Sequence, residues 1–450
     1  MAVRLIDSLS TTEPLAEIFS DNSILQAMLD FEIALARAEA RAGIIPQNAA
    51  DAIAAAARTS SLDVAAIARG GLSAATVSIP FVKALTTLVN ARSAEAAKFV
   101  HWGATSQDVA DTAMILLLKR TRPALVADLT RTESALRTLA DEHSQTVMLG
   151  RTLMQAAPPA TFGLKAAGWL GAIRRSRVRL ESAFREALVV EFGGATGTLA
   201  ALGDRGVEVG AALADELGLQ FPDAPWHTQR DRLAALVCAS GVLTGALGKM
   251  ARDVALMAQT EVAEVAEPGE PGRGRSSTMP HKRNPVGSVI ALAAANRVPG
   301  LVASFLSGMV QEHERSAGGW QSEWPTISNV VQATGVAAAS MADVAEGLSV
   351  DEQKMRKNID ATNGLVFAER AMILLGPALG RDAAHRLVEQ ATRRSVEEKK
   401  SLAEVLREIP EVKKVLEAST LASLDDPKAY LGVADEFRTR LLAQGRDSKK

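Results

Sequence analysis

The sequence is poor in aromatic side chains and in cysteine. Phe, Trp and Tyr make up 4% of its 450 residues, with one Tyr, and there is one cysteine. A lone cysteine, Cys238, excludes an internal disulfide and a thiolate metal cluster, and its apolar neighbours predict that it is buried. The apolar content comes instead from Ala, Leu and Val, and Ala and Leu favour helices.

The sequence also lacks an excess of acidic or of basic residues. The chain has 50 basic and 52 acidic residues, a formal net charge of −2. Nucleic acid as the main partner would require a basic surface, so we do not expect it. The N-terminus lacks the apolar core of a signal peptide, and no stretch of about 18 apolar residues predicts a membrane span. These absences favour the cytoplasm and no membrane partner.

Long helical periodicity dominates the middle of the chain. In the region 228–265, one apolar stripe at helical spacing is formed by Leu236, Leu243, Leu247, Met250, Val254 and Met257. Similar patterns predict helices over about 107–141, 160–188, 285–310 and 326–348. Helices of this length usually pack side by side as a bundle. Strand-forming runs between turn signals are nearly absent, so a parallel sheet is not expected.

The expected fold is all-α, with three helical domains. Shorter helices broken by Gly and Pro form the first domain, 1–110, and the last, 359–450. The long helices form a central bundle domain, 111–358.

Three segments carry polar side chains that suit chemistry, and the first is His101–Asp108. Thr105 and Ser106 fit the N-cap of the following helix, and Asp108 completes a pattern like a capping box. Free N–H groups at a helix start attract anions. A plain cap beside a buried His101 is the alternative.

The second segment, Gly150–Pro159, is interpreted as a proline-terminated connection between helices. Arg151 and Gln155 would donate to an anion or a carbonyl, and an ordinary loop is the alternative. The third, Arg275–Asn284, follows a Gly- and Pro-rich stretch, and such long irregular segments are functional lids or disordered. A serine among cations suits proton transfer, whereas a solvated basic loop is the alternative.

Signals for a cofactor are missing. The six histidines lack the spacing of metal ligands. There is no phosphate-binding glycine loop and no dinucleotide motif. We therefore expect neither a metal nor a nucleotide cofactor.

The sequence Ser-Ser-Thr-Met-Pro-His-Lys-Arg-Asn-Pro at 276–285 closely resembles the signature of the fumarase/aspartase superfamily. Residues 101–112 and 151–159 resemble its two other characteristic regions, in the same order. The resemblance covers essentially the whole chain. It implies a homotetramer in which the central domains form a twenty-helix core, with active sites that combine the three segments from three subunits.

Most members of the superfamily cleave a C–O or C–N bond beta to a carboxylate, through an aci-carboxylate. The resemblance implies that Ser276 exchanges the alpha proton, while Lys282 and Asn284 hold a substrate carboxylate and stabilise the developing charge. The sequence leaves open whether Ser276 or Ser277 carries the proton. The predicted substrate-binding residues are His101, Thr105, Ser106, Arg151, Thr152, Gln155, Ser277 and Arg315.

Two positions depart from the lyases of this superfamily. Leu153 and Val289 stand where those lyases carry the His and the Glu of an acid dyad that protonates the leaving group. A carboxylate leaving group needs no such proton, because its pKa is near 4. The departures therefore indicate an intramolecular carboxylate that adds to a conjugated double bond and forms a lactone.

The segment 313–324 supports this interpretation, because it is similar to the lactone-forming cycloisomerases of aromatic (protocatechuate) catabolism. Arg315 is our choice for a substrate carboxylate, since a guanidinium binds it bidentately. A helix-surface ion pair is the alternative for Arg315. A small tricarboxylate substrate would suit Lys282, Arg283, Arg151 and Arg315.

Two other hypotheses remain open. One is an adenylosuccinate lyase-like enzyme that releases fumarate, which the His-aromatic-Gly segment at His101 favours. The other is a structural protein without activity, as in lens crystallins related to this superfamily. The serine, lysine and asparagine of the signature weigh against that role.

Overall fold

The structure, a computed structural model, describes residues 5–269, 274, 278–279 and 281–443. The described chain is mostly helical, which confirms the all-α prediction. It divides into two compact units. Unit 1 comprises Met1–Leu129, Ser176–Gly248 and Ile290–Ser340, and unit 2 comprises Thr130–Arg175, Lys249–Val289 and Met341–Lys450. The three-domain division stays a prediction.

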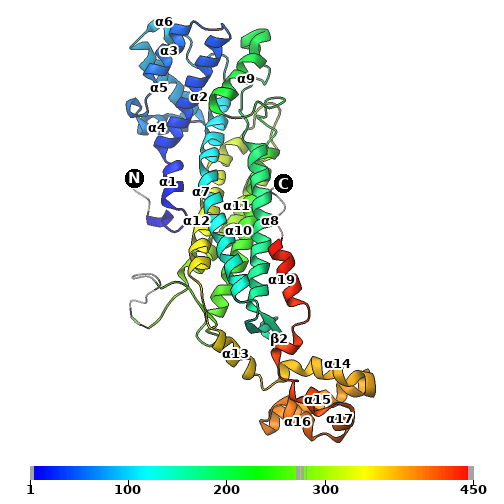
Figure 1. Ribbon diagram of the computed structural model, residues 1–450. Helices are drawn as coiled ribbons and strands as arrows, with labels where there is room; N and C mark the ends of the chain where they lie inside the picture. Colours follow the sequence, from blue (N-terminus) through cyan, green and yellow to red (C-terminus); the bar gives the residue numbers. More distant parts are fainter. Residues whose placement is uncertain (1–4, 270–273, 275–277, 280, 444–450) are drawn as a thin grey trace. The chain divides into compact units, whose positions relative to one another are not determined.

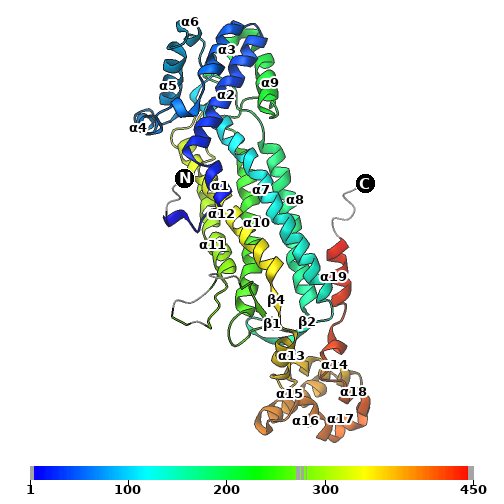
Figure 2. The same ribbon diagram turned by 60° about the vertical axis from the view of Figure 1, so that its left-hand side comes forward.

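Five long helices contribute residues to both units. They are α7 (Ser106–Glu142), α8 (Phe162–Ala187), α10 (Asp231–Met257), α11 (Val286–Ser307) and α12 (Gly319–Gly347). Within each unit, the helical segments that it contains run side by side (Figures 1 and 2). All five were predicted from periodicity. Helix α12 begins seven residues before the predicted start, because it continues through Pro325.

The predicted apolar stripe of α10 is confirmed. Its six residues are each at most 4% exposed, because one face of the helix is buried along its whole length. Cys238 lies beside this stripe and is only partly buried, so the prediction of a buried thiol is wrong. The neighbours Leu236 and Ala239 take the core-facing positions instead.

Unit 1 also contains the shorter helices of the N-terminal region and one helix from the middle of the chain. They are α1 (Glu13–Ile18), α2 (Asp21–Arg41), α3 (Gln47–Ala56), α4 (Val64–Ala74), α5 (Ser78–Asn90), α6 (Ala94–Ala97) and α9 (Gly206–Leu217), with 3-10 turns at Leu5–Asp7, Thr59–Ser61 and Ala200–Arg205. Helix α2 is central, since it packs on both α3 and α9.

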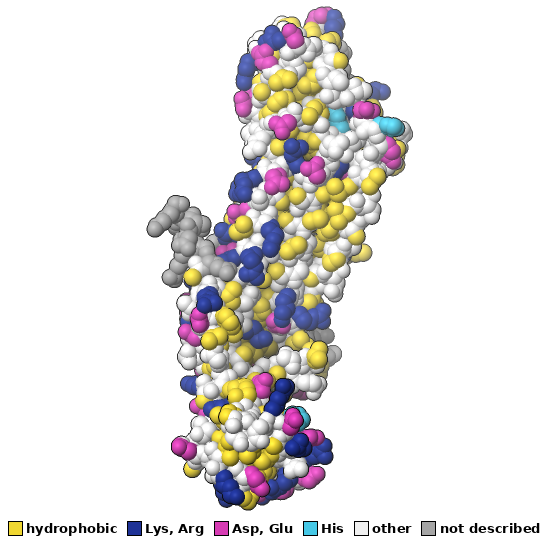
Figure 3. Space-filling view, turned by 90° about the vertical axis from the view of Figure 1, so that its right-hand side faces the viewer, with side chains coloured by type: hydrophobic (Ala, Val, Ile, Leu, Met, Phe, Trp, Pro, Cys, Tyr) yellow, Lys and Arg dark blue, Asp and Glu magenta, His cyan; other side chains and the backbone are white. Residues whose placement is uncertain are grey.

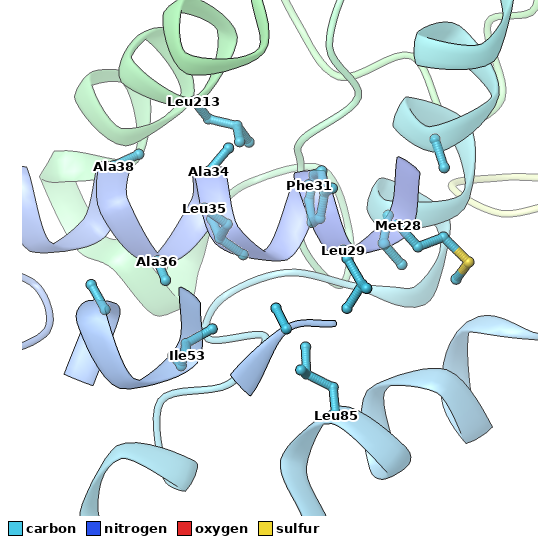
Figure 4. Packing of buried hydrophobic residues seen from close by; sticks show 14 of the residues in the cluster. Met28, Leu29, Phe31, Ala34, Leu35, Ala36, Ala38, Ile53, Leu85 and Leu213 are labelled. Atoms are coloured by element: carbon cyan, nitrogen blue, oxygen red, sulfur yellow. The ribbon is translucent and has the colours of Figure 1, made fainter. Parts of the chain in front are cut away.

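The core around α2 consists of closely packed apolar side chains (Figure 4). Phe31 and Leu35 of α2 are buried with Ile53 of α3, Leu85 of α5 and Leu213 of α9. Each such side chain contributes about 1.5–3 kcal/mol when fully buried. This packing fixes the position of α2, whose buried residues also include Glu32 and Glu39.

A buried guanidinium joins three elements of unit 1. Arg230, just before α10, donates to Asp111 of α7 at 2.7 and 3.1 Å and to Glu323 of α12. The indole N–H of Trp320 donates to Asp111 at 2.9 Å, and the guanidinium carbon lies 4.7 Å from the ring centroid of Trp226. A buried charge is tolerated only when it is paired in this way.

Unit 2 contains short antiparallel ladders and the C-terminal helices. Strands β1 (Val147–Thr152) and β2 (Gln155–Thr161) form one hairpin, and β3 (Val265–Ala266) pairs with β4 (Ser349–Val350). The helices are α13 (Glu352–Asp360), α14 (Ala368–Leu379), α15 (Arg381–Glu398), α16 (Leu402–Glu408), α17 (Pro410–Val415), α18 (Ala418–Ala422) and α19 (Ala434–Ala443), with 3-10 turns at Leu365–Phe367 and Pro427–Tyr430.

The C-terminal helices of unit 2 have a core of their own. Leu375 of α14, Val388 of α15, Leu406 of α16 and Val412 of α17 are buried together. Helix α19 lies beside α8 in both ribbon views (Figures 1 and 2), and Leu441 packs where Gly171 has no side chain.

Two described helices, α10 and α11, are long and apolar enough to cross a membrane by length and composition alone. Core helices of water-soluble proteins pass the same test, so this is weak evidence for a membrane span. In the most apolar window, 56% of α10 but only 22% of α11 is buried. The surface shown in Figure 3 carries Lys and Arg interspersed with Asp and Glu, as expected from a balanced charge.

Candidate active site

The first predicted segment begins α7, as expected, but its cap is made by Asp108. The Asp108 carboxylate accepts the backbone N–H of Thr105 at 2.9 Å, and the Thr105 carbonyl accepts the N–H of Asp108 at 3.0 Å. The hydroxyl of Thr105 is therefore not used for the cap. Ser106 is the first helical residue.

Asp108 is fully buried and connects three stretches of unit 1. Besides Thr105, it accepts the backbone N–H groups of Gly193 at 3.1 Å and Gly194 at 3.0 Å. Nε2 of His227 lies 2.6 Å from the same carboxylate. The position of the 193–194 loop is thus tied to the start of α7.

Asp108, Glu191 and His227 are the described group whose residue types suit a metal ion, with ligand atoms within 4.8 Å of one another. Burial, together with the negative charges of Asp108 and Asp111, raises the pKa of Glu191 well above its ordinary range. The 2.6 Å contact between His227 and Asp108 requires a proton between them. We therefore interpret the group as a hydrogen-bonded cluster.

Arg315 lies in the loop before α12 and contacts the first segment. Its guanidinium donates to the hydroxyl of Thr105 at 2.9 Å and to the carbonyls of Gly194 at 3.3 Å and Ala195 at 2.9 Å. In the part of the chain that the structure describes, no carboxylate pairs with it. The alternative of a helix-surface ion pair is therefore wrong, and the positive charge of Arg315 is available to an anion.

His101, the fourth predicted residue in unit 1, is placed next to α2. Its Nδ1 lies 2.6 Å from the carboxylate of Glu32, which is buried. The side chain of His101 is only partly buried, so the alternative of a buried histidine at this position is wrong, and its partner Glu32 was not predicted.

The second segment connects two helices, α7 and α8, as predicted, but it does so as a β-hairpin, so the alternative of an ordinary loop is wrong. Thr152 pairs with Gln155 across a two-residue turn in which Leu153 and Met154 both have positive φ. At Gly150, a Cβ atom would lie 2.2 Å from the carbonyl oxygen of Pro158, so only glycine allows the strands to approach this closely. Proline is accepted because a two-stranded ladder leaves each strand with a free edge.

Arg151 leaves this hairpin towards a buried carboxylate. Its guanidinium donates to both oxygens of Glu264 at 2.9 and 2.7 Å, and Asn358 donates to Glu264 at 2.8 Å. The charge of Arg151 is thus already matched within unit 2. Its role as a substrate-binding residue stays a prediction, as do those of Thr152 and Gln155, whose side chains are exposed at the turn.

The two positions at which the resemblance places the acid dyad of the lyases are both exposed. Leu153 is 97% exposed at the tip of the hairpin, and Val289 is 55% exposed near the start of α11. Neither side chain can donate a proton. The inference of a carboxylate leaving group stays a prediction.

The signature segment is described in part. Ser276 and Ser277 lie outside the described residues. Lys282 is exposed and Asn284 is partly buried, and the backbone N–H of Asn284 donates to Gly274 at 2.8 Å. The carboxylate of Glu267 accepts the N–H groups of Gly287 at 2.9 Å and Ser288 at 2.8 Å, which anchors the first turn of α11.

The described site residues form two groups, each within one unit. In unit 1, Arg315 contacts Thr105, and Thr105 belongs to the same short segment as His101 and Ser106. Unit 2 contains the other described site residues, which are Arg151, Thr152, Gln155, Lys282 and Asn284. Sequence reasoning missed the partners Glu32, His227 and Glu264. Of these three, only Glu32 could have been noticed in the sequence, because it is a charged residue within an otherwise apolar helix face.

Comparison with known proteins places this fold and these segments in one family. Residues 8–300 match the family model described as lyase, and residues 364–441 match the model described as adenylosuccinate lyase C-terminus. The chain belongs to this lyase family, the fumarase/aspartase superfamily, as the signature at 276–285 predicted.

Individual relatives are similar over nearly their full length. The 3-carboxy-cis,cis-muconate cycloisomerase of Bradyrhizobium diazoefficiens is 49% identical over 94% of each chain. A nitrosuccinate lyase of Streptomyces davaonensis is 43% identical over 96% of this chain and 92% of its own. The crystal structure of the 3-carboxy-cis,cis-muconate lactonizing enzyme from Pseudomonas putida matches with a TM-score of 0.92, at 45% identity over 98% of each chain. The chain is thus an enzyme of the superfamily.

Proposed function

We propose that this enzyme converts 3-carboxy-cis,cis-muconate to 4-carboxymuconolactone, in the protocatechuate branch of aromatic catabolism. The proposal is carried by Leu153 and Val289, two exposed aliphatic residues that stand where the resemblance implies the acid dyad of the lyases. A reaction in which the departing or adding group is a carboxylate needs no acid at this place. Near-full-length similarity to a cycloisomerase of that name supports the choice of substrate.

The reaction is an internal addition. One substrate carboxylate forms a C–O bond to the conjugated diene, the π electrons move to the carbon alpha to another carboxylate, and an aci-carboxylate forms. This carbon then takes up one proton, for which we propose Ser276 as donor. Lys282 and Asn284 would stabilise the aci-carboxylate. The ionised substrate takes up one net proton, and water then restores the proton of Ser276, so solvent is the only other reactant.

The substrate carries three carboxylates, and the described chain offers cations for them. Arg315 is bound only to neutral acceptors. Lys282 is exposed and has no ion-pair partner among the described residues. Arg151 is already paired with Glu264, so we rank it behind these two.

We further propose a cytoplasmic homotetramer whose sites are shared between subunits. Helix α11 supports this, because it is strongly apolar although only 22% of its most apolar window is buried in one chain. An apolar helix exposed in this way marks a protein contact surface.

The direct test is ultraviolet absorbance of 3-carboxy-cis,cis-muconate mixed with purified protein. Lactone formation breaks the conjugated diene, so the absorbance should fall without added metal or nucleotide. An unchanged spectrum with folded protein would contradict the proposed reaction.

A second candidate is release of fumarate from adenylosuccinate. The match of residues 364–441 to the adenylosuccinate lyase C-terminus favours it. Incubation with adenylosuccinate and an enzymatic assay for fumarate separate the two. Fumarate release at a rate above that of muconate turnover would replace the cycloisomerase proposal.

A further inference from the structure

The imidazole of His101 is held from one side by a carboxylate that solvent does not reach. Nδ1 of His101 lies 2.6 Å from Oε1 of Glu32, and Glu32 is only 1% exposed on the core-facing side of α2. A buried carboxylate requires a donor, and an imidazolium supplies a charge-assisted one. Glu32 is thus buried at this position because His101 is its partner.

The backbone of this segment leaves little freedom to the ring. His101 has φ of 60° and Gly103 has φ of 69°, and a Cβ atom on Gly103 would lie 2.9 Å from Leu202. A non-glycine residue in the left-handed region persists only where its surroundings enforce it. Here the contact of His101 with Glu32 and the close approach of Leu202 to Gly103 enforce the backbone conformation.

The charges around His101 favour its protonated form. Burial alone lowers the pKa of His101, but the attraction and hydrogen bond of Glu32 outweigh it, and Asp108 at the start of α7 adds to them. The net result is a pKa above the ordinary value. Glu39, a second acidic residue on the same side of α2, is uncharged near pH 7, because burial raises its pKa to about 9.

The other nitrogen of the ring remains available. Nδ1 is taken by Glu32, and among the residues that the structure describes none hydrogen-bonds Nε2. The side chain is 15% exposed, which is enough for one contact from outside. Four residues further on, Thr105 accepts the guanidinium of Arg315, so one short segment combines two sources of positive charge.

We propose that Glu32 is a positioning residue, which holds His101 as an imidazolium so that its Nε2–H binds a carboxylate of the substrate. The inference rests on the proposed function for the identity of the anion, and extends it to a pair outside the signature. His101 then differs from the lost acid dyad, because it keeps its proton and contributes to binding.

The test compares Glu32→Gln with Glu39→Gln, two isosteric changes on one helix. Ring-labelled histidine, assigned with His101→Asn, gives the NMR titration of His101 in each protein. Glu32→Gln should lower the pKa of His101, and Glu39→Gln should leave it as in the wild type. The same pKa in all three proteins would overturn the proposal.

Steady-state kinetics with 3-carboxy-cis,cis-muconate supply the second measurement. At a pH between the His101 midpoints that the titrations of the variant and the wild type give, Glu32→Gln should raise KM about tenfold with kcat within about twofold, because uniform binding is lost. The difference in KM should close towards about pH 5.5, where the imidazole of the variant is also protonated. A fall in kcat at unchanged KM would contradict a role in binding.

These readouts separate this inference from the proposed reaction. The NMR titration needs no substrate, so an inactive protein with the expected titration would contradict the reaction alone. If Glu32→Gln does not fold, the NMR chemical shifts of the two ring nitrogens of wild-type His101 at about pH 7 still show whether the imidazole is protonated. Both ring nitrogens should be protonated, and a neutral ring would overturn the inference.

Discussion

At the scale of the residue, Glu39 is the acid whose surroundings suit it least. It is fully buried on α2, and neither carboxylate oxygen has a hydrogen-bond partner among the residues that the structure describes. Burial, followed by repulsion from Glu32, raises its pKa from 4.5 to about 9. The native protein thus keeps a proton that the unfolded chain releases between these values, so this group lowers stability progressively as pH rises from about 4.5 towards 9.

Glu39→Gln should remove this pH dependence, because glutamine has no proton to lose. Between about pH 6 and about pH 8.5, the wild type should lose roughly 2–3 kcal/mol of stability that the variant retains. Urea unfolding of both proteins at the two pH values measures the difference. Parallel losses in the two proteins would show that Glu39 ionises normally.

A second prediction concerns the serines of the signature. Ser276→Ala should lower kcat for muconate lactonisation by at least about a hundredfold, the low end for acid–base catalysis. Ser277→Ala is the matched variant, and its effect should be smaller and fall mainly on KM. A larger loss of kcat in Ser277→Ala than in Ser276→Ala would identify Ser277 as the proton donor. Rates near those of the wild type in both variants would show that neither serine takes part in the chemistry.

At the scale of the element, the hairpin β1–β2 depends on one glycine. In Gly150→Ala, the methyl group would meet the Pro158 carbonyl at 2.2 Å, which the backbone can avoid only by shifting the strands. We expect a loss of roughly 2–4 kcal/mol, typical of backbone clashes and overpacking. Thermal unfolding followed by circular dichroism measures it.

The matched substitution is Gly376→Ala on α14, where a Cβ atom meets nothing within 4 Å. There alanine should be neutral or stabilise by up to about 1 kcal/mol, because it favours a helix more than glycine. Equal melting temperatures for both variants would mean that the strands of the hairpin tolerate separation.

The long helices could be predicted from sequence because their apolar stripes repeat over many turns. The hairpin could not, because Gly150 and Pro158 are breakers in a helical pattern and its strands have only six and seven residues. The partners of the site residues were also hidden, since Glu264 is 113 residues from Arg151 and Glu32 is 69 residues from His101. Spacing along the chain carries no information about such contacts.

At the scale of the whole molecule, the exposed apolar surface of α11 predicts association. Leu306→Glu places a charge where 42% of an apolar side chain is exposed, and burying it between subunits would be costly. Analytical ultracentrifugation should show species smaller than the proposed tetramer of the wild type, and the proposed sharing of sites between subunits predicts reduced activity as well.

Ile373→Glu on α14 is the control, since it introduces the same charge at a side chain that is 59% exposed. It should leave the sedimentation unchanged. A variant Leu306→Glu that sediments as the wild type would show that this part of α11 lies outside the contact.

The buried guanidinium of Arg230 constrains the order in which unit 1 can form. Its two carboxylate partners lie 119 residues before it, at Asp111, and 93 residues after it, at Glu323. Closing such long loops is entropically unfavourable until several contacts form together. A nascent chain that ends before α12 lacks half of this pairing, so Arg230 would retain its hydration there. Unit 1 therefore cannot complete this pairing until α12 has been synthesised, so its final packing depends on one of the last segments that it contains.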